Sequence, residues 1–210
     1  MKRVFALLLA LLLLLTFPGC RRQKLPPEVA AAKPVIYLYP EEKTEVSVKL
    51  AFDGELTSTY PAYKDGWSVT AEPDGTLHDE NGREYYCLFW EGVSNTEYDF
   101  STGFTVPGGK TAAFLEKTLA EIGLTEKEAN EFIIYWLPKM EHNAYNLISF
   151  QTEVYTDAAK LEITPTPESL LRVFMAWKAV DEPEEIKPQS FEPFERKGFT
   201  AVEWGGTDIE

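Results

Sequence analysis

The feature that most constrains the fold is an unbroken apolar run, Val35–Tyr39, that lies between Pro34 and Pro40. Its β-branched and aromatic residues favour a β-strand, and the two prolines mark its ends. A strand with one face in water alternates apolar with polar residues, whereas a run without alternation needs apolar cover on both faces. The segment Lys33–Pro40 is therefore predicted to be a central strand, covered by hairpins of residues 46–90 and by later helices.

The residues before this run are predicted to be a signal peptide followed by a tether. Lys2 and Arg3 precede an apolar run, Val4–Phe17, that only Thr16 interrupts. The run is shorter than the roughly 20 residues that a membrane-spanning helix needs. Residues 1–19 are therefore predicted to be a cleaved signal peptide. Residues 20–33 contain basic residues and prolines but no periodic apolar face, which is typical of a tether.

The end of the signal segment, Thr16–Cys20, resembles the lipobox of bacterial lipoproteins, in which a small residue precedes the lipid-modified cysteine. Gly19 is that small residue, and Phe17 stands where the motif usually has leucine. The resemblance implies lipidation of Cys20, an exported protein, and anchoring on the extracellular or periplasmic side of the cell membrane. Stable anchoring needs more than one acyl chain. The alternative is an ordinary secretory signal followed by an incidental cysteine.

Charge and cysteine content limit the partners and the covalent bonds of the chain. The sequence has 34 acidic and 20 basic residues and a net charge of −14. An acidic surface repels the phosphate backbone, so nucleic acid is not an expected partner. If Cys20 carries lipid, Cys87 has no partner within the chain, and no disulfide is predicted. The core must then come from packing alone.

Residues 34–95 contain short strand patterns separated by turn signals, which favours a β-sandwich or a partial barrel. Val46–Phe52 alternates apolar and polar residues, and Glu55–Tyr60 is predicted to return antiparallel beside it. Asn81-Gly82 predicts a type I′ turn, which needs two residues with positive φ. This turn would lead into a strand at Glu84–Trp90.

Residues 96–210 combine helices with further strands. Helical spacing over Phe114–Ile122 ends at Gly123, and a capping box at Thr125–Glu128 begins a second helix. The β-branched and aromatic run Phe132–Leu137 favours a return to strand before Pro138. Later strands are predicted at 147–150, 161–163, 170–180 and 199–204, and Gly205-Gly206 should end the last one. The predicted class is α+β, with 96–210 packed on 34–95 as a second part or as one continuous domain.

Three residues are candidates for acid–base chemistry. Glu91 ends an intensely apolar strand, where partial burial suits the acid of a glycosidase. Glu141 is a candidate second carboxylate, and His142 beside it is a candidate general base. The alternatives are a strand-end acid that points to water and an exposed turn histidine. Cys87 lies among aromatic residues, and a buried unreactive thiol is the favoured interpretation.

Other site signals are weak. The sequence has neither paired-cysteine nor His-Glu-x-x-His zinc motifs, and no metal or cofactor is predicted. His78 beside the Asn-Gly turn is interpreted as exposed. Tryptophans occur only inside sheet-like runs, where they either fill a core or form a sugar-stacking platform. They are Trp67, Trp90, Trp136, Trp177 and Trp204.

Several segments together resemble a family of uncharacterised lipoproteins of bacteria, with related segments in some fungal proteins. The resemblance covers nearly the whole chain after the signal segment, and it implies one coherent unit without an activity to transfer. The segments that carry it are Lys33–Pro40 (KPVIYLYP), Tyr60-Pro61, Gly66-Trp67, Tyr85–Gly92, Tyr135–Phe150 and Phe194–Gly206.

Two hypotheses of function follow from the sequence. The first is a lipid-anchored envelope protein without catalytic activity, which binds a glycan or another envelope protein. The second is an envelope hydrolase of the glycosidase type that uses Glu91, Glu141 and His142.

Overall fold

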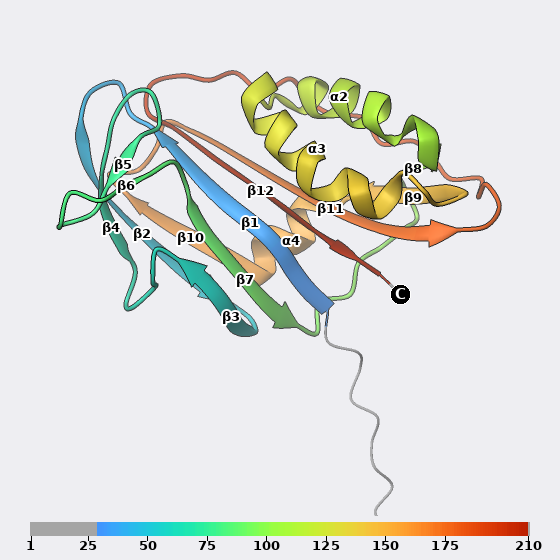
Figure 1. Cartoon of the computed structure of the whole chain (residues 1–210), viewed down its shortest axis with the longest axis horizontal. Coiled ribbons are helices and arrows are strands. Elements are labelled where there is room, and N and C mark those ends of the chain that lie inside the picture. The colour runs from blue at the N-terminus through green and yellow to red at the C-terminus, as the bar shows by residue number, and fades with distance from the viewer. Residues whose placement is uncertain (1–28, 210) are drawn as a thin grey trace, which may run out of the picture.

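Two β-sheets packed face to face, with a pair of helices on the larger sheet, make up residues 29–209 in the computed structural model (Figure 1). This architecture confirms the predicted α+β class with sandwich-like sheets. Cys20, the signal segment and the first residues of the tether lie outside the described residues. None of the helices formed by residues 29–209 has the length and apolar character that a membrane crossing requires.

Within the described residues the larger sheet has seven strands, and the smaller sheet has five. In the larger sheet β11 and β12 run parallel, and the other neighbours are antiparallel. Its order is β3 (Glu55–Tyr60), β7 (Leu88–Ser94), β1 (Val29–Tyr39), β12 (Thr200–Asp208), β11 (Ser169–Val180), β9 (Tyr145–Phe150) and β8 (Phe104–Pro107). The smaller sheet is antiparallel, in the order β10 (Ala159–Thr164), β2 (Thr44–Phe52), β4 (Trp67–Ala71), β5 (Leu77–His78) and β6 (Glu84–Tyr85).

Strand β1 has the two-sided cover that its sequence predicts. Ile36 and Leu38 face the interior between the two sheets, where they pack with side chains of β2 and β4. Val35 and Tyr37 face the helical layer. β1 also begins at Val29, earlier than expected. The predicted end of the tether at residue 33 is therefore wrong, because the preceding residues already pair with β7.

The helical layer consists of η1 (Gly108–Lys110), α2 (Thr111–Ile122) and α3 (Glu126–Met140). Gly123 ends α2 with φ 114°, a left-handed conformation that glycine adopts readily. The predicted capping box is confirmed, because the Thr125 hydroxyl accepts from the Glu128 N–H while the Glu128 carboxylate accepts from the Thr125 N–H. A third helix, α4 (Thr152–Ala158), was not predicted.

The strand predicted at Phe132–Leu137 is wrong, because α3 continues through this run. Phe132, Trp136 and Met140 recur at a spacing of four residues, and all three are fully buried against the larger sheet. Burying these large side chains stabilises the helix by more free energy than the low helix propensity of β-branched and aromatic residues costs. Pro138 is tolerated since the carbonyl that it leaves unpaired belongs to Ile134, on the exposed side of the helix.

The predicted pairing of Val46–Phe52 with Glu55–Tyr60 is also wrong. β2 pairs with β4 and β10, whereas β3 pairs with β7 in the other sheet. The Asp53-Gly54 turn therefore carries the chain from one sheet to the other. The Phe52 ring, at the end of β2, packs edge-on against Trp90 of β7 with 5.0 Å between ring centroids.

The strand predicted at Glu84–Trp90 is divided between the two sheets. Glu84–Tyr85 forms β6, β7 begins at Leu88, and Tyr86 and Cys87 connect them. The preceding turn is not type I′, because Gly82 has positive φ and Asn81 does not. Asp79 closes this turn instead, since its carboxylate accepts from the backbone N–H groups of Asn81 and Arg83 at 2.9 Å each.

Strand β12 continues past Gly205-Gly206 to Asp208, so these glycines do not end it as predicted. A Cβ at Gly206 would lie 2.7 Å from the Trp136 ring, and only glycine allows this close approach of helix to strand. Each sheet contains a block of strands from 34–95 beside strands from 96–210, with β1 next to β12 in the larger sheet and β2 next to β10 in the smaller. The two ranges therefore share both sheets.

A buried ion pair lies between the sheets. The side chain of Arg172 on β11 is 7% exposed and that of Glu203 on β12 is fully buried. Arg172 Nε donates to Glu203 Oε2 at 2.7 Å, and Arg172 Nη1 donates to the Ala159 carbonyl at 2.6 Å. Trp90 Nε1 donates to the other carboxylate oxygen at 3.1 Å. The pair thus connects β7, β10, β11 and β12.

We expect Arg172→Met to lower the free energy of unfolding by about 3–5 kcal/mol, because it leaves the Glu203 carboxylate buried without a counter-charge. The free energy of unfolding should fall less in the double variant Arg172→Met/Glu203→Gln than in the single variant, because glutamine is neutral and its side-chain oxygen still accepts from Trp90. Urea unfolding of both variants measures this. A double variant less stable than Arg172→Met alone would contradict it.

Candidate functional site

The helical layer leaves one side of the larger sheet open, and a pocket of about 510 Å³ lies there. In Figure 1, α2 and α3 lie over the β11 and β12 side of the sheet, and neither helix overlies β7 or β3. Aromatic side chains from three separate parts of the chain line the pocket. They are Tyr60, Tyr85, Tyr86, Phe89 and Tyr135.

Lys33 reaches the pocket from an irregularity in β1. Between Ala31 and Val35 the strand holds one residue more than its partner β7 between Gly92 and Phe89, which defines a bulge. Lys33 has φ 60°, a left-handed conformation that costs a residue with a Cβ about 1–2 kcal/mol. Among residues 29–209, it is the only residue other than glycine with positive φ. Such strained conformations are common at functional sites.

The Lys33 side chain lies against aromatic faces of the pocket. Its Nζ is 5.3 Å from the centre of the Phe89 ring and 5.9 Å from that of Tyr135, within the range of cation–π attraction. The ion pairs formed within residues 29–209 do not include Lys33. The ammonium therefore keeps donors available for a ligand.

Two carboxylates also line the pocket, those of Glu84 and Glu91. Glu91 Oε1 accepts the backbone N–H of Lys33 at 3.1 Å, so the bulge fixes this carboxylate beside the rings. Glu91 is the predicted candidate that the structure places in the pocket. The pocket thus combines aromatic rings, one fixed carboxylate, a second exposed carboxylate and a donor, an arrangement that binds small polar molecules.

The other predicted candidates lie elsewhere. Glu141 follows the last residue of α3, and His142 comes next, with a side chain that is 86% exposed. His142 Nε2 and Glu141 Oε1 are 3.7 Å apart, and neither residue lines the aromatic pocket. Within residues 29–209, no group of three or more His, Cys, Asp or Glu side chains is arranged to hold a metal ion.

Cys87 lines the pocket but is 7% exposed. Burial raises the pKa of its thiol to about 12, partly opposed by the positive charge of Lys33. At neutral pH the thiol is therefore protonated, whereas the thiolate is the nucleophile. The geometry does not favour cysteine chemistry at this position.

All five tryptophans are buried, so the sugar-stacking platform of tryptophans does not exist. The exposed aromatic residues are tyrosines instead, with Tyr60 at 51% and Tyr86 at 53% exposure. Sequence reasoning missed these tyrosines and Lys33. Two signals were present: Tyr60 ends a strand pattern, and Lys33 precedes a proline at the start of the apolar run. Tyr86 lies within the predicted strand Glu84–Trp90, and no sequence signal marked it as exposed.

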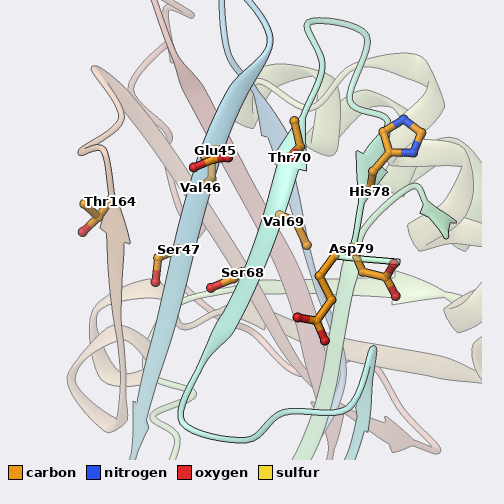
Figure 2. A pocket seen from close by; sticks show the side chains of 10 residues that line it. Glu45, Val46, Ser47, Ser68, Val69, Thr70, His78, Asp79 and Thr164 are labelled. Carbon is orange, nitrogen blue, oxygen red and sulfur yellow. The ribbon is translucent and has the colours of Figure 1, made fainter. Parts of the chain in front are cut away.

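A second, more polar depression of about 450 Å³ lies on the outer face of the smaller sheet. Figure 2 shows Ser47 of β2 beside Ser68 of β4, with His78 and Asp79 following on β5 and the turn after it. Glu45 lies near Ser47 on β2, and Thr164 lies on β10, which pairs with β2 on the side away from β4. The depression holds hydroxyl and carboxylate groups but lacks the aromatic rings of the first pocket.

Comparison with protein families finds none that matches the chain, and comparison with solved structures also finds no match. A relative from Butyrivibrio fibrisolvens, named "Uncharacterized protein in bglA 3'region", is 49% identical over 63 residues. The match covers 29% of this chain and 65% of the relative, so the chain spans just under two thirds of that protein's length. The name of the relative states no activity.

The conformation of Lys33 can be tested by stability. We expect Lys33→Gly to hold or raise the free energy of unfolding, by up to about 1 kcal/mol, because glycine removes the left-handed strain. Lys33→Val should lower it by about 1–3 kcal/mol, since a β-branched residue is disfavoured at positive φ. Urea unfolding compares the two. A glycine variant less stable than the valine variant would contradict the bulge.

Proposed function

We propose that this protein is a lipid-anchored lipoprotein of the bacterial cell envelope, whose folded part binds a saccharide in the aromatic pocket without catalysis. The lipid on Cys20 would hold it to the outer side of the membrane. It would belong to the uncharacterised lipoproteins that share the Lys33–Pro40 signature. The observation that carries the saccharide proposal is the exposure of Tyr60 and Tyr86 beside fixed polar groups.

The chemistry of the pocket suits a sugar. Tyr60 and Tyr86 are each about half exposed, and exposed tyrosine rings pack against the C–H groups of a sugar ring. Glu84 and Glu91 accept hydrogen bonds from sugar hydroxyls, and Lys33 donates to hydroxyl oxygens. The volume of about 510 Å³ falls within the range of small-molecule sites. A stable protein partner would need a contact area of about 800 Å² on this chain.

A hydrolase of the glycosidase type is the second candidate, since Glu84 and Glu91 line one pocket. Glycosidases use two carboxylates that flank the scissile bond. In such a hydrolase Glu91 would be the acid, as predicted from the sequence. Glu84 would be the second carboxylate, the role predicted for Glu141. Release of reducing ends from bound oligosaccharides, lost in Glu91→Gln, would favour the hydrolase over the binding module.

Anchoring is tested separately. We expect Cys20→Ala, expressed in a bacterial host, to move the protein from the membrane fraction to the soluble fraction, because the acyl chains have no other acceptor in the proposal. The native chain, fractionated in parallel, is the control. Retention of the variant in the membrane fraction would show that Cys20 is not the anchor.

Saccharide binding is tested at Tyr86. We expect Tyr86→Ala to weaken binding of cello-, xylo- or chito-oligosaccharides about 2- to 10-fold, because a stacked ring contributes about 0.5–1.5 kcal/mol beyond its buried area. Isothermal titration calorimetry on the anchored chain in detergent measures this.

The matched control is Ile134→Ala, which removes an exposed side chain from the helix that carries Tyr135 without changing the pocket. Equal affinities of both variants and the native chain would contradict the assignment of the pocket.

A further inference from the structure

We infer that the saccharide site is an extended groove with several sugar subsites, which binds the interior of a linear polysaccharide. The inference rests on the proposed function and adds the class of ligand. Three depressions of the surface share lining residues with one another. The aromatic pocket lies at one end of the row and the polar depression of Figure 2 at the other end. In the order along the surface we call the aromatic pocket the first depression and the polar depression the third.

A middle depression of about 390 Å³ borders both of the others. It shares Tyr85 with the aromatic pocket. It shares Ser68, Asp79 and Glu80 with the polar depression. The three depressions therefore follow one another across the surface, from the open side of the larger sheet, past the β5–β6 turn, to the outer face of the smaller sheet.

The junction between the depressions is held by specific contacts. The Tyr85 hydroxyl donates to Asp79 Oδ2 at 3.1 Å, while the Tyr85 ring packs edge-on against Tyr60 with centroids 5.4 Å apart. Arg83 lies over both rings, 5.8 Å from the Tyr85 centroid and 5.9 Å from that of Tyr60. Asp79 in turn closes the β5–β6 turn. These contacts fix the relative positions of the first two depressions.

The chemistry changes along the groove in a way that suits a polymer of sugars. The first depression supplies ring faces, and the third supplies hydroxyl and carboxylate groups from neighbouring strands. Ser47 and Ser68 are directly paired across β2 and β4, and Figure 2 shows them on the same face. One sugar would stack in the aromatic pocket while its neighbours donate hydroxyl hydrogen bonds to the middle and third depressions. A single sugar ring would leave these two depressions empty.

The test is the dependence of affinity on chain length. Disaccharides and octasaccharides of the cello, xylo and chito series are titrated into the full chain in detergent micelles. We expect the octasaccharide of the series that binds to bind at least about tenfold tighter than its disaccharide. Equal affinity for disaccharide and octasaccharide would overturn the extended groove and leave the proposed function intact. Failure of every series at every length would count against the proposed function itself.

A matched pair of variants locates the additional subsites. Ser68→Arg places a large side chain where the middle and third depressions meet, and should remove most of the octasaccharide's advantage while the disaccharide affinity stays unchanged. Ala51→Arg adds the same charge at an exposed position of β2 outside the depressions. It should change neither affinity. Loss of affinity for both lengths in Ser68→Arg, or for the octasaccharide in Ala51→Arg, would overturn the assignment.

Discussion

The structure depends on one constraint, which is that the larger sheet must be covered on both faces. The apolar run of β1 has no face that water could solvate, so it requires the smaller sheet on one side and the helices on the other. Strand β12 beside it is covered in the same way, and the buried charges of Arg172 and Glu203 neutralise each other in the interior between the sheets. The burial of α3 against the sheet and the close approach of Trp136 to Gly206 are part of this cover.

The candidate site lies where this cover ends. The helices do not extend over β7 and β3, so the aromatic residues there are only partly buried and remain available to a ligand. The bulge at Lys33 lies at the same boundary, where β1 changes its register against β7. The strained lysine, the carboxylate of Glu91 that it binds and the exposed tyrosines thus lie together at one edge of the helical layer.

Local signals in the sequence predicted a strand, a helix end and a helix start correctly, but failed at Asn81-Gly82 and Gly205-Gly206. The run Val35–Tyr39, the stop at Gly123 and the capping box at Thr125 depend on neighbouring residues only, and the structure confirms them. The prediction at Phe132–Leu137 failed because residue type was given more weight than the four-residue spacing of the side chains that the sheet buries. The partners of β2 and β3 were wrong since they are set by distant strands. The pocket was missed for the same reason, because its residues come from β1, β3, α3 and the segment that runs from β6 into β7.

The central claim is that a saccharide binds where the helical cover of the larger sheet ends. Amide chemical-shift mapping by NMR, with the oligosaccharide series that binds, tests it most directly. We expect the largest shifts at Lys33, Tyr86, Phe89 and Glu91, with no change in the acidic loop at Asp181–Glu184 on another part of the surface. Shifts confined to that loop, or to the end of α3 at Glu141 and His142, would contradict it.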